Sequence, residues 1–263
     1  MHATFRRRSD PALPLALGLA AISWAILLLL FAIGGEELVS HDAIVGHEAV
    51  PGLLQLVLFV AVWQLMTAAM MLPSSLAVMA LFARASRAQP HRDMALAIFL
   101  AAYFGVWTGF AVAALFGDGL IHRGVDAWPW LDERPWLVQG SVLLLAGGFQ
   151  FSPLKERCLT ACRNPVQYLF RHYGRGLRAA AATGLRHALF CLGCCWALML
   201  LMFALGVGNI AWMAALAAVM IVEKSVPGGR RLAPVVGVVL LVMGVLTLAH
   251  LSWLPIDWLP PEA

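Results

Sequence analysis

Residues 13–33 read LPLALGLAAISWAILLLLFAI, a run of 21 residues without a charged side chain. A helix rises about 1.5 Å per residue, so about 20 apolar residues cross the hydrocarbon core of a bilayer. The run is also longer than the apolar segment of a signal peptide. It therefore predicts a retained transmembrane helix.

The composition of the chain extends this conclusion to its full length. The 263 residues are 62% hydrophobic and 12% charged, with a mean hydropathy of +0.83. Soluble domains are nearer 45–50% apolar and about 25% charged. A soluble domain, a disordered chain and a secreted disulfide scaffold are all excluded by these values.

Six further apolar runs follow the first. We therefore expect an all-α, polytopic bundle of about seven transmembrane helices that forms a single transmembrane domain over residues 1–263. The fourth and sixth runs are short, so they are either tilted spans or a partly re-entrant pair. The predicted spans are 13–33, 53–82, 94–116, 136–151, 179–205, 207–222 and 232–253.

Lysine and arginine gather in alternate loops between these runs. With seven spans, 16 of the 18 Lys and Arg residues lie on one side, and only Arg123 and Arg134 lie on the other. Positively charged loops face the cytoplasm. We expect a bacterial inner-membrane protein with a cytoplasmic N-terminus, a cytoplasmic segment 153–178 and a periplasmic C-terminus. Charge spread over loops argues against nucleic-acid binding and suits contact with membrane lipid.

Residues 187–202 read HALFCLGCCWALMLLM and concentrate soft donors in one predicted span. At about 100° per residue, six donor side chains cover about 140° of the helix surface, which is one broad face. Thiolate and thioether suit Cu(I), with imidazole acceptable beside them. Zinc, which takes Cys and His but rarely Met, is the alternative metal, and plain apolar packing is the alternative role. The candidate ligands are His187, Cys191, Cys194, Cys195, Met199 and Met202.

The second predicted span carries three methionines before a proline. Met66 and Met70 are spaced i, i+4, while Met71 points away from Met66. Pro73 frees a backbone carbonyl in mid-span, and we expect the two serines that follow it to satisfy this carbonyl. The methionines either extend a thioether path for the metal or pack around the kink.

Residues 150–165, QFSPLKERCLTACRNP, form a basic segment that bears two cysteines. A helix that begins at Pro153 places Cys158 and Cys162 on one side. A structural disulfide is not expected in the cytoplasm, and the flanking basic residues favour thiolates. The pair is a candidate metal-transfer point. The alternative is an interfacial amphipathic helix with incidental cysteines.

Charged and polar groups lie at the ends of the two short spans. Lys155 and Lys224 are the only lysines, and each closes one of these spans. Glu223 is a candidate functional carboxylate with Lys224, Lys155 or a bound cation as its partner, and Gln150 adds a further polar group. The alternative is a Glu223–Lys224 pair that snorkels at the interface.

Three motifs together resemble one bacterial family. They are Met70-Met71-x-Pro73-Ser74, Gln150-x2-Pro153-Leu154-Lys155-x2-Cys158-x3-Cys162-Arg163-x-Pro165, and Gly184-x6-Cys191-x2-Cys194-Cys195-Trp196-x-Leu198-Met199-x2-Met202. The pairs Trp212-Met213 and Glu223-Lys224 share the resemblance. The family is described as predicted metal-binding integral membrane proteins, a domain of unknown function. The resemblance runs from about Leu53 to Lys224. It implies a metal-binding role but names neither the metal nor its handling.

Missing motifs narrow the choice of function. The sequence has no Walker A motif and no Cys-Pro-Cys motif, which excludes an ATP-driven pump. The leading hypothesis is a non-enzymatic protein that handles Cu(I), either as a transporter or by delivery to a membrane cuproenzyme, with a metallochaperone as a further partner.

Two other classes remain open. One is an accessory or assembly subunit of a membrane complex without a metal of its own, for which the ten tryptophans are the supporting feature. Aromatic belts account for much of that number. The other is a thiol–disulfide enzyme, which needs exposed thiols of low pKa, whereas these cysteines lie in mid-span.

Overall fold

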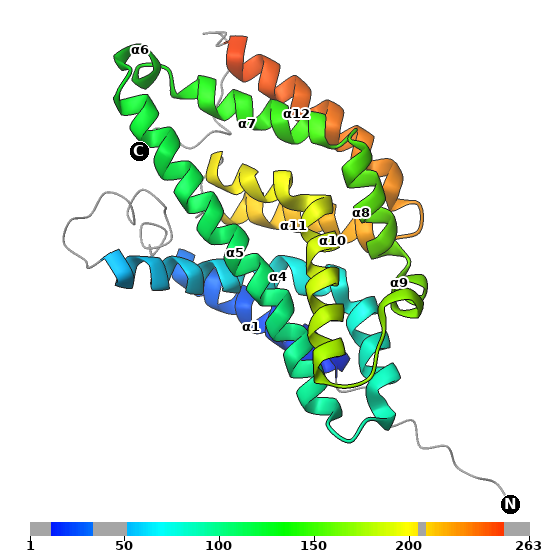
Figure 1. Ribbon diagram of the computed structural model, residues 1–263. Helices are drawn as coiled ribbons and strands as arrows, with labels where there is room; N and C mark the ends of the chain where they lie inside the picture. Colours follow the sequence, from blue (N-terminus) through cyan, green and yellow to red (C-terminus); the bar gives the residue numbers. More distant parts are fainter. Residues whose placement is uncertain (1–11, 34–51, 205–208, 250–263) are drawn as a thin grey trace, which may run out of the picture.

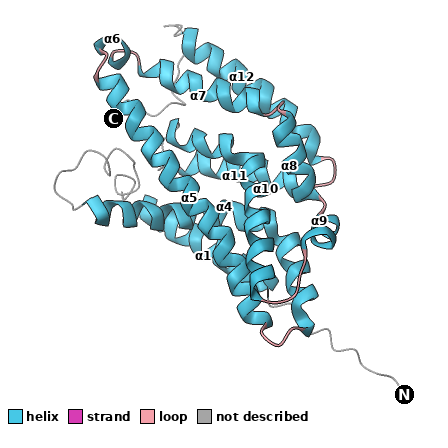
Figure 2. Cartoon of the chain, in the orientation of Figure 1, coloured by secondary structure: helices cyan, strands magenta, loops and turns pink. Residues whose placement is uncertain are grey.

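The computed structural model describes residues 12–33, 52–204 and 209–249, and every regular element in these ranges is helical (Figures 1 and 2). This confirms the all-α class. Two short 3₁₀ turns, Ser86–Ala88 and Gly229–Arg231, join longer helices. The helices are α1 (Ala12–Ala32), α4 (Gly52–Ala85), α5 (Arg92–Asp126), α6 (Pro129–Asp132), α7 (Pro135–Phe149), α8 (Pro153–Arg163), α9 (Pro165–His172), α10 (Leu177–Ala204), α11 (Ile210–Ser225) and α12 (Leu232–Ala249).

Each predicted apolar run coincides with one helix, although not all of these helices are full spans. Five are long and apolar enough to cross a membrane, namely α1, α4, α5, α10 and α12. Helices α7 and α8 are bent by 61° at their junction and together would make a sixth span or a re-entrant loop. Helix α11 has only 16 residues. Residues 205, 207–208 and 250–253 of the predicted spans lie outside the described part of the chain.

Helix α5 extends ten residues beyond the predicted end of its span at residue 116, so the helix is longer than the apolar run alone predicts. The extension keeps its helical hydrogen bonds despite its polar residues. His122 lies one turn after Asp118, with its Nδ1 3.1 Å from the Asp118 carbonyl oxygen and 3.5 Å from the carboxylate. Local i, i+4 pairing of this kind stabilises a helix that hydropathy alone does not predict.

Small residues set how closely the helices pack. The most extensive contacts join α5 to α10, α7 to α12 and α1 to α4. A Cβ at Gly184 of α10 would collide with the backbone carbonyl of Phe99 on α5. Helices α7 and α12 lie side by side (Figure 1), and a Cβ at Gly147 would lie 2.9 Å from Leu241 Cγ. Close backbone approach through glycine is typical of helix pairs in membranes.

Helices α8 and α9 fold back against the bundle. Ser152 caps α8 by accepting a hydrogen bond from the Lys155 backbone N–H (3.1 Å). The inner face of α8, which includes both cysteines, is buried against α10 and α11. On α9, the Tyr168 hydroxyl donates to the Thr183 carbonyl (2.6 Å), and burial raises the pKa of Tyr168, which keeps it a donor.

The Gly184 contact predicts that an added methyl group destabilises the protein at Gly184 but not at Gly105. Gly184→Ala should lower the free energy of unfolding by about 1–3 kcal/mol, because the new Cβ meets backbone that cannot yield easily. Gly105→Ala on α5 is the control, because a Cβ there meets nothing within 4 Å. Thermal unfolding in detergent measures both variants. Equal melting temperatures for the two would contradict the observed helix crossing.

Candidate metal centre

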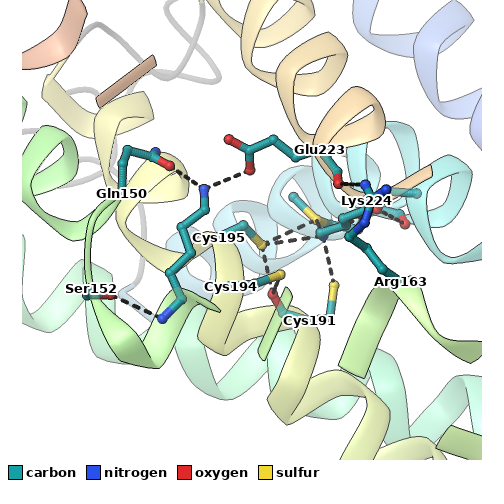
Figure 3. Close-up of polar contacts among 11 residues, drawn as sticks. Gln150, Ser152, Arg163, Cys191, Cys194, Cys195, Glu223 and Lys224 are labelled. Carbon is teal, nitrogen blue, oxygen red and sulfur yellow. Dashed lines mark hydrogen bonds and ion pairs between the residues drawn. The ribbon is translucent and has the colours of Figure 1, made fainter. Parts of the chain in front are cut away.

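Two cysteines of α10 and one methionine of α4 meet inside the bundle (Figure 3). Cys191 and Cys195 lie one turn apart on the same face of α10, and Cys195 Sγ lies 3.8 Å from Met71 Sδ. None of the three side chains is more than 1% exposed. We call these three residues the sulfur pocket.

A proline in α4 shapes the backbone that presents Met71. Pro73 has no N–H for the carbonyl of Ala69, four residues earlier. The indole of Trp24 on α1 donates to that carbonyl (3.1 Å). The expectation that the following serines satisfy it is therefore wrong: Ser74 donates instead to the Met71 carbonyl (2.9 Å). Helix α1 thus stabilises the helix turn that carries Met71.

The Lys224 ammonium of α11 points into the sulfur pocket. Its Nζ lies 3.3 Å from Cys191 Sγ, 3.6 Å from Cys195 Sγ and 3.7 Å from Met71 Sδ. It also donates to the Ser74 hydroxyl at 3.3 Å. Lys224 is only 6% exposed. The pocket is therefore formed by α4, α10 and α11 around one buried positive charge.

A tyrosine of α5 adds a polar contact to the pocket. The Tyr103 hydroxyl lies 3.2 Å from Cys191 Sγ and 3.2 Å from the Ser75 hydroxyl. Cys191 Sγ thus faces both an ammonium and a hydroxyl, the kind of donors that stabilise a sulfur anion. Cys195 differs, because its thiol donates to the Cys191 carbonyl (2.9 Å).

The second lysine forms a separate buried ion pair. Lys155 Nζ lies 2.7 Å from Glu223 Oε2 and also donates to the Gln150 side-chain oxygen. Arg163 donates to the backbone carbonyl of Glu223. Glu223 and Lys224 are both buried inside the protein, so the alternative of a Glu223–Lys224 pair that snorkels to the interface is wrong. Of the partners considered for Glu223, the structure selects Lys155.

The remaining cysteines form a second group beside the pocket. Cys162 of α8 interacts with Cys194 of α10, whose thiol donates to the Cys191 carbonyl (3.1 Å). Cys158 packs over Gly193, where a Cβ would lie 2.6 Å from its sulfur. All five cysteines lie in the described ranges, and none forms a disulfide. Helix α8 therefore brings its two thiols next to those of α10.

Several predicted ligands lie outside the pocket. His187 is buried between the rings of Phe99 and Tyr103, and its Nε2 has no partner within the described ranges. Four methionines are buried but have no polar or sulfur contact with the pocket among the residues described. They are Met66 and Met70 on α4, and Met199 and Met202 on α10.

Residues 60–247 match the model of the PpoB2 family, which is described as a copper chaperone. The chain belongs to this family. The matched stretch contains the whole sulfur pocket and all five cysteines. No curated protein and no solved structure matches the chain. Membership of the PpoB2 copper chaperone family supports a copper-related function and agrees with the expected metal.

The donor set of this PpoB2 family member fits copper better than zinc. Structural zinc sites in proteins are four-coordinate and use thiolate and imidazole ligands. In the described ranges no three His, Cys, Asp or Glu side chains are grouped as they would be around a metal ion. Two thiols with one thioether are instead the soft donors that monovalent copper prefers. His187 has no contact that would make it a fourth donor.

Two features of this PpoB2 site have no counterpart in the sequence motifs, namely the contact of Tyr103 with Cys191 and the central position of Lys224. Tyr103 has no local motif, and only the packing of α5 on α10 brings it to Cys191. Lys224 is a candidate polar residue from its place in a hydrophobic helix, but its position at the centre of the sulfur pocket depends on how α11 packs on α4. A lysine in an otherwise apolar helix is the one sequence signal that leads to it.

The Lys155–Glu223 pair predicts strong coupling between α8 and α11. Lys155→Met should lower the free energy of unfolding by about 3–5 kcal/mol, because it leaves a buried carboxylate unpaired. Adding Glu223→Gln should restore most of this loss. Arg230→Gln is the control, because it breaks an exposed ion pair with Glu156 worth about 1 kcal/mol or less. Denaturation in detergent measures all four proteins, and a Lys155→Met loss no larger than the control's would contradict the pairing.

Proposed function

We propose that this PpoB2 family member binds Cu(I) in the sulfur pocket and delivers it to a copper enzyme or metallochaperone, as a binding protein without catalytic activity. One observation supports this most directly: Cys191, Cys195 and Met71 come from two helices and present their sulfurs to one buried point. Soft sulfur ligands select Cu(I), and burial shields the bound ion from water and oxidants.

The proposal places the protein in the bacterial inner membrane with seven spans, its N-terminus in the cytoplasm and its C-terminus in the periplasm. Five helices long enough to cross a bilayer support the membrane location. The concentration of Lys and Arg in alternate connections supports the orientation. In this orientation, α8 and α9 lie at the cytoplasmic side and contact membrane lipid through their basic residues.

A route for the metal follows from the order of sulfurs along the helices. In the proposed orientation, the methionines at positions 66, 70, 199 and 202 lie on the periplasmic side of the pocket. Cys194 and then Cys162 and Cys158 lead from the pocket into α8. Neighbouring thiols can exchange a soft metal without releasing it to water. We assign the methionines to the periplasmic half of the route and the α8 cysteines to the cytoplasmic half.

An accessory subunit without a metal is the second candidate. Its supporting observation is the amount of apolar surface on α1 and α12, where residues such as Leu29 and Val245 are more than half exposed. Lipid contact explains the same surface without a partner. A thiol–disulfide enzyme is disfavoured, because all five cysteines are buried and such enzymes need accessible thiols.

Copper binding tests the proposed function directly. Protein purified anaerobically in detergent should hold close to one copper per chain after loading with Cu(I), measured by elemental mass spectrometry. Cys191→Ser combined with Cys195→Ser should lose that copper while the protein stays folded, because hydroxyls are poor ligands for Cu(I). Wild-type protein that takes up no copper, or only zinc, would contradict the proposal.

Two buried methionines of α4, Met71 and Met79, allow a matched test of the thioether ligand. Met71→Leu should weaken Cu(I) binding by about tenfold or more, through loss of one soft donor. Met79→Leu should leave affinity unchanged, because Met79 packs toward α1 and the start of α5. Competition with a chromophoric Cu(I) chelator measures both affinities. Equal effects of the two substitutions would remove Met71 from the site.

Fusions at the C-terminus test the proposed topology. Alkaline phosphatase, which is active only in the periplasm, should be active there, and green fluorescent protein, exported unfolded by the same route, should be dark. The same reporters placed after residue 175 in the loop between α9 and α10 should show the reverse pattern. A fluorescent C-terminal fusion would imply an even number of spans.

A further inference from the structure

The Lys224 ammonium occupies the point toward which the pocket sulfurs converge. Its nitrogen lies 3.3 Å from the Cys191 sulfur and 3.6 Å from the Cys195 sulfur (Figure 3), and 3.7 Å from the Met71 sulfur. Lys224 therefore stands at the centre of the soft donors rather than beside them. An ammonium and Cu(I) each carry one positive charge, so the two cations would compete for the same position.

Among the carboxylates of the described residues, none forms an ion pair with the Lys224 ammonium. Among the described residues, the neighbouring Glu223 forms its ion pair with Lys155, and Lys224 is hydrogen-bonded only to sulfurs and to the Ser74 hydroxyl. The Cys195 thiol and the Met71 thioether are weak hydrogen-bond acceptors, so only a thiolate at Cys191 would hold the ammonium firmly. The same sulfurs are strong ligands for Cu(I). The pocket is thus better matched to the metal than to the lysine.

Burial explains why a cation is needed there at all. An uncompensated charge is costly in an apolar interior, and a thiolate at Cys191 would be one. The Lys224 ammonium supplies the opposite charge in the metal-free protein. If Cu(I) bound while the ammonium stayed, two positive charges would lie within a few ångströms of each other.

We propose that Lys224 is a displaceable internal counter-cation that Cu(I) must replace to bind the sulfur pocket. This inference rests on the proposed function. A Cu–S bond forms at the Cys191 thiolate as the ammonium leaves the pocket with its proton, so one positive charge replaces another beside Cys191. The Cys195 thiol gives its proton to solvent when its sulfur binds the metal, the Met71 thioether binds as a neutral donor, and copper stays monovalent. The returning ammonium then favours release of Cu(I) to the next ligand, as delivery requires.

Two substitutions of Lys224 distinguish competition with Cu(I) from stabilisation of the Cys191 thiolate. Lys224→Leu removes the competing charge and should raise Cu(I) affinity by about tenfold or more, with slower release to a chelator. Lys224→Arg keeps the charge, so its affinity should stay at or below that of the wild type. If Lys224 only supports the thiolate, the signs reverse: Lys224→Leu weakens binding and Lys224→Arg rescues it.

The measurement is competition for Cu(I) with a chromophoric chelator in anaerobic detergent solution, together with the rate of release after mixing. If the leucine variant does not fold, Lys224→Gln is the neutral substitute and carries the same expectation. Weaker binding by the neutral variant, or tighter binding by the arginine variant, would overturn the inference. If the wild type binds no Cu(I), the proposed function fails instead, whatever the Lys224 variants do.

Discussion

Charges buried among apolar helices constrain the arrangement of this bundle. Lys155, Glu223 and Lys224 are nearly inaccessible, and each such charge must be compensated within the protein. The Lys155–Glu223 pair fixes α8 to α11, and Arg163 strengthens this junction through the Glu223 carbonyl. Lys224 is satisfied instead by sulfurs and a hydroxyl, which requires α4 and α10 to converge on α11. The position of the sulfur pocket therefore follows from how these charges are satisfied.

This arrangement fits a protein that holds copper briefly better than one that stores it. A deeply buried pair of thiols with a thioether would bind Cu(I) tightly and release it slowly without a competitor. Lys224, at the centre of the sulfur pocket, would be such a competitor, and the thiols of Cys194 and Cys162 would be the next ligands. Both features agree with membership of a family described as a copper chaperone.

Much of the fold could be predicted from hydropathy, because a charge-free run of about 20 residues has few alternatives to a membrane helix. The set of candidate ligands could be predicted from the sequence, but not which of them lie in the sulfur pocket. Helical periodicity shows that Cys191 and Met199 share a broad face, yet only the packing of α4 against α10 selects Cys191 and Cys195. The bond from Trp24 to the Ala69 carbonyl and the place of Lys224 depend on contacts between distant helices, for which the sequence has no local signal.

X-ray absorption at the copper edge of the Cu(I)-loaded protein tests the central claim most directly. The account predicts the edge of monovalent copper and a first shell made of sulfur alone, from Cys191, Cys195 and Met71. Lys224 nitrogen should be absent from that shell, because the ammonium has left the pocket. A first shell dominated by nitrogen or oxygen, or a sulfur shell unchanged when Cys191 and Cys195 are replaced by serine, would contradict the account.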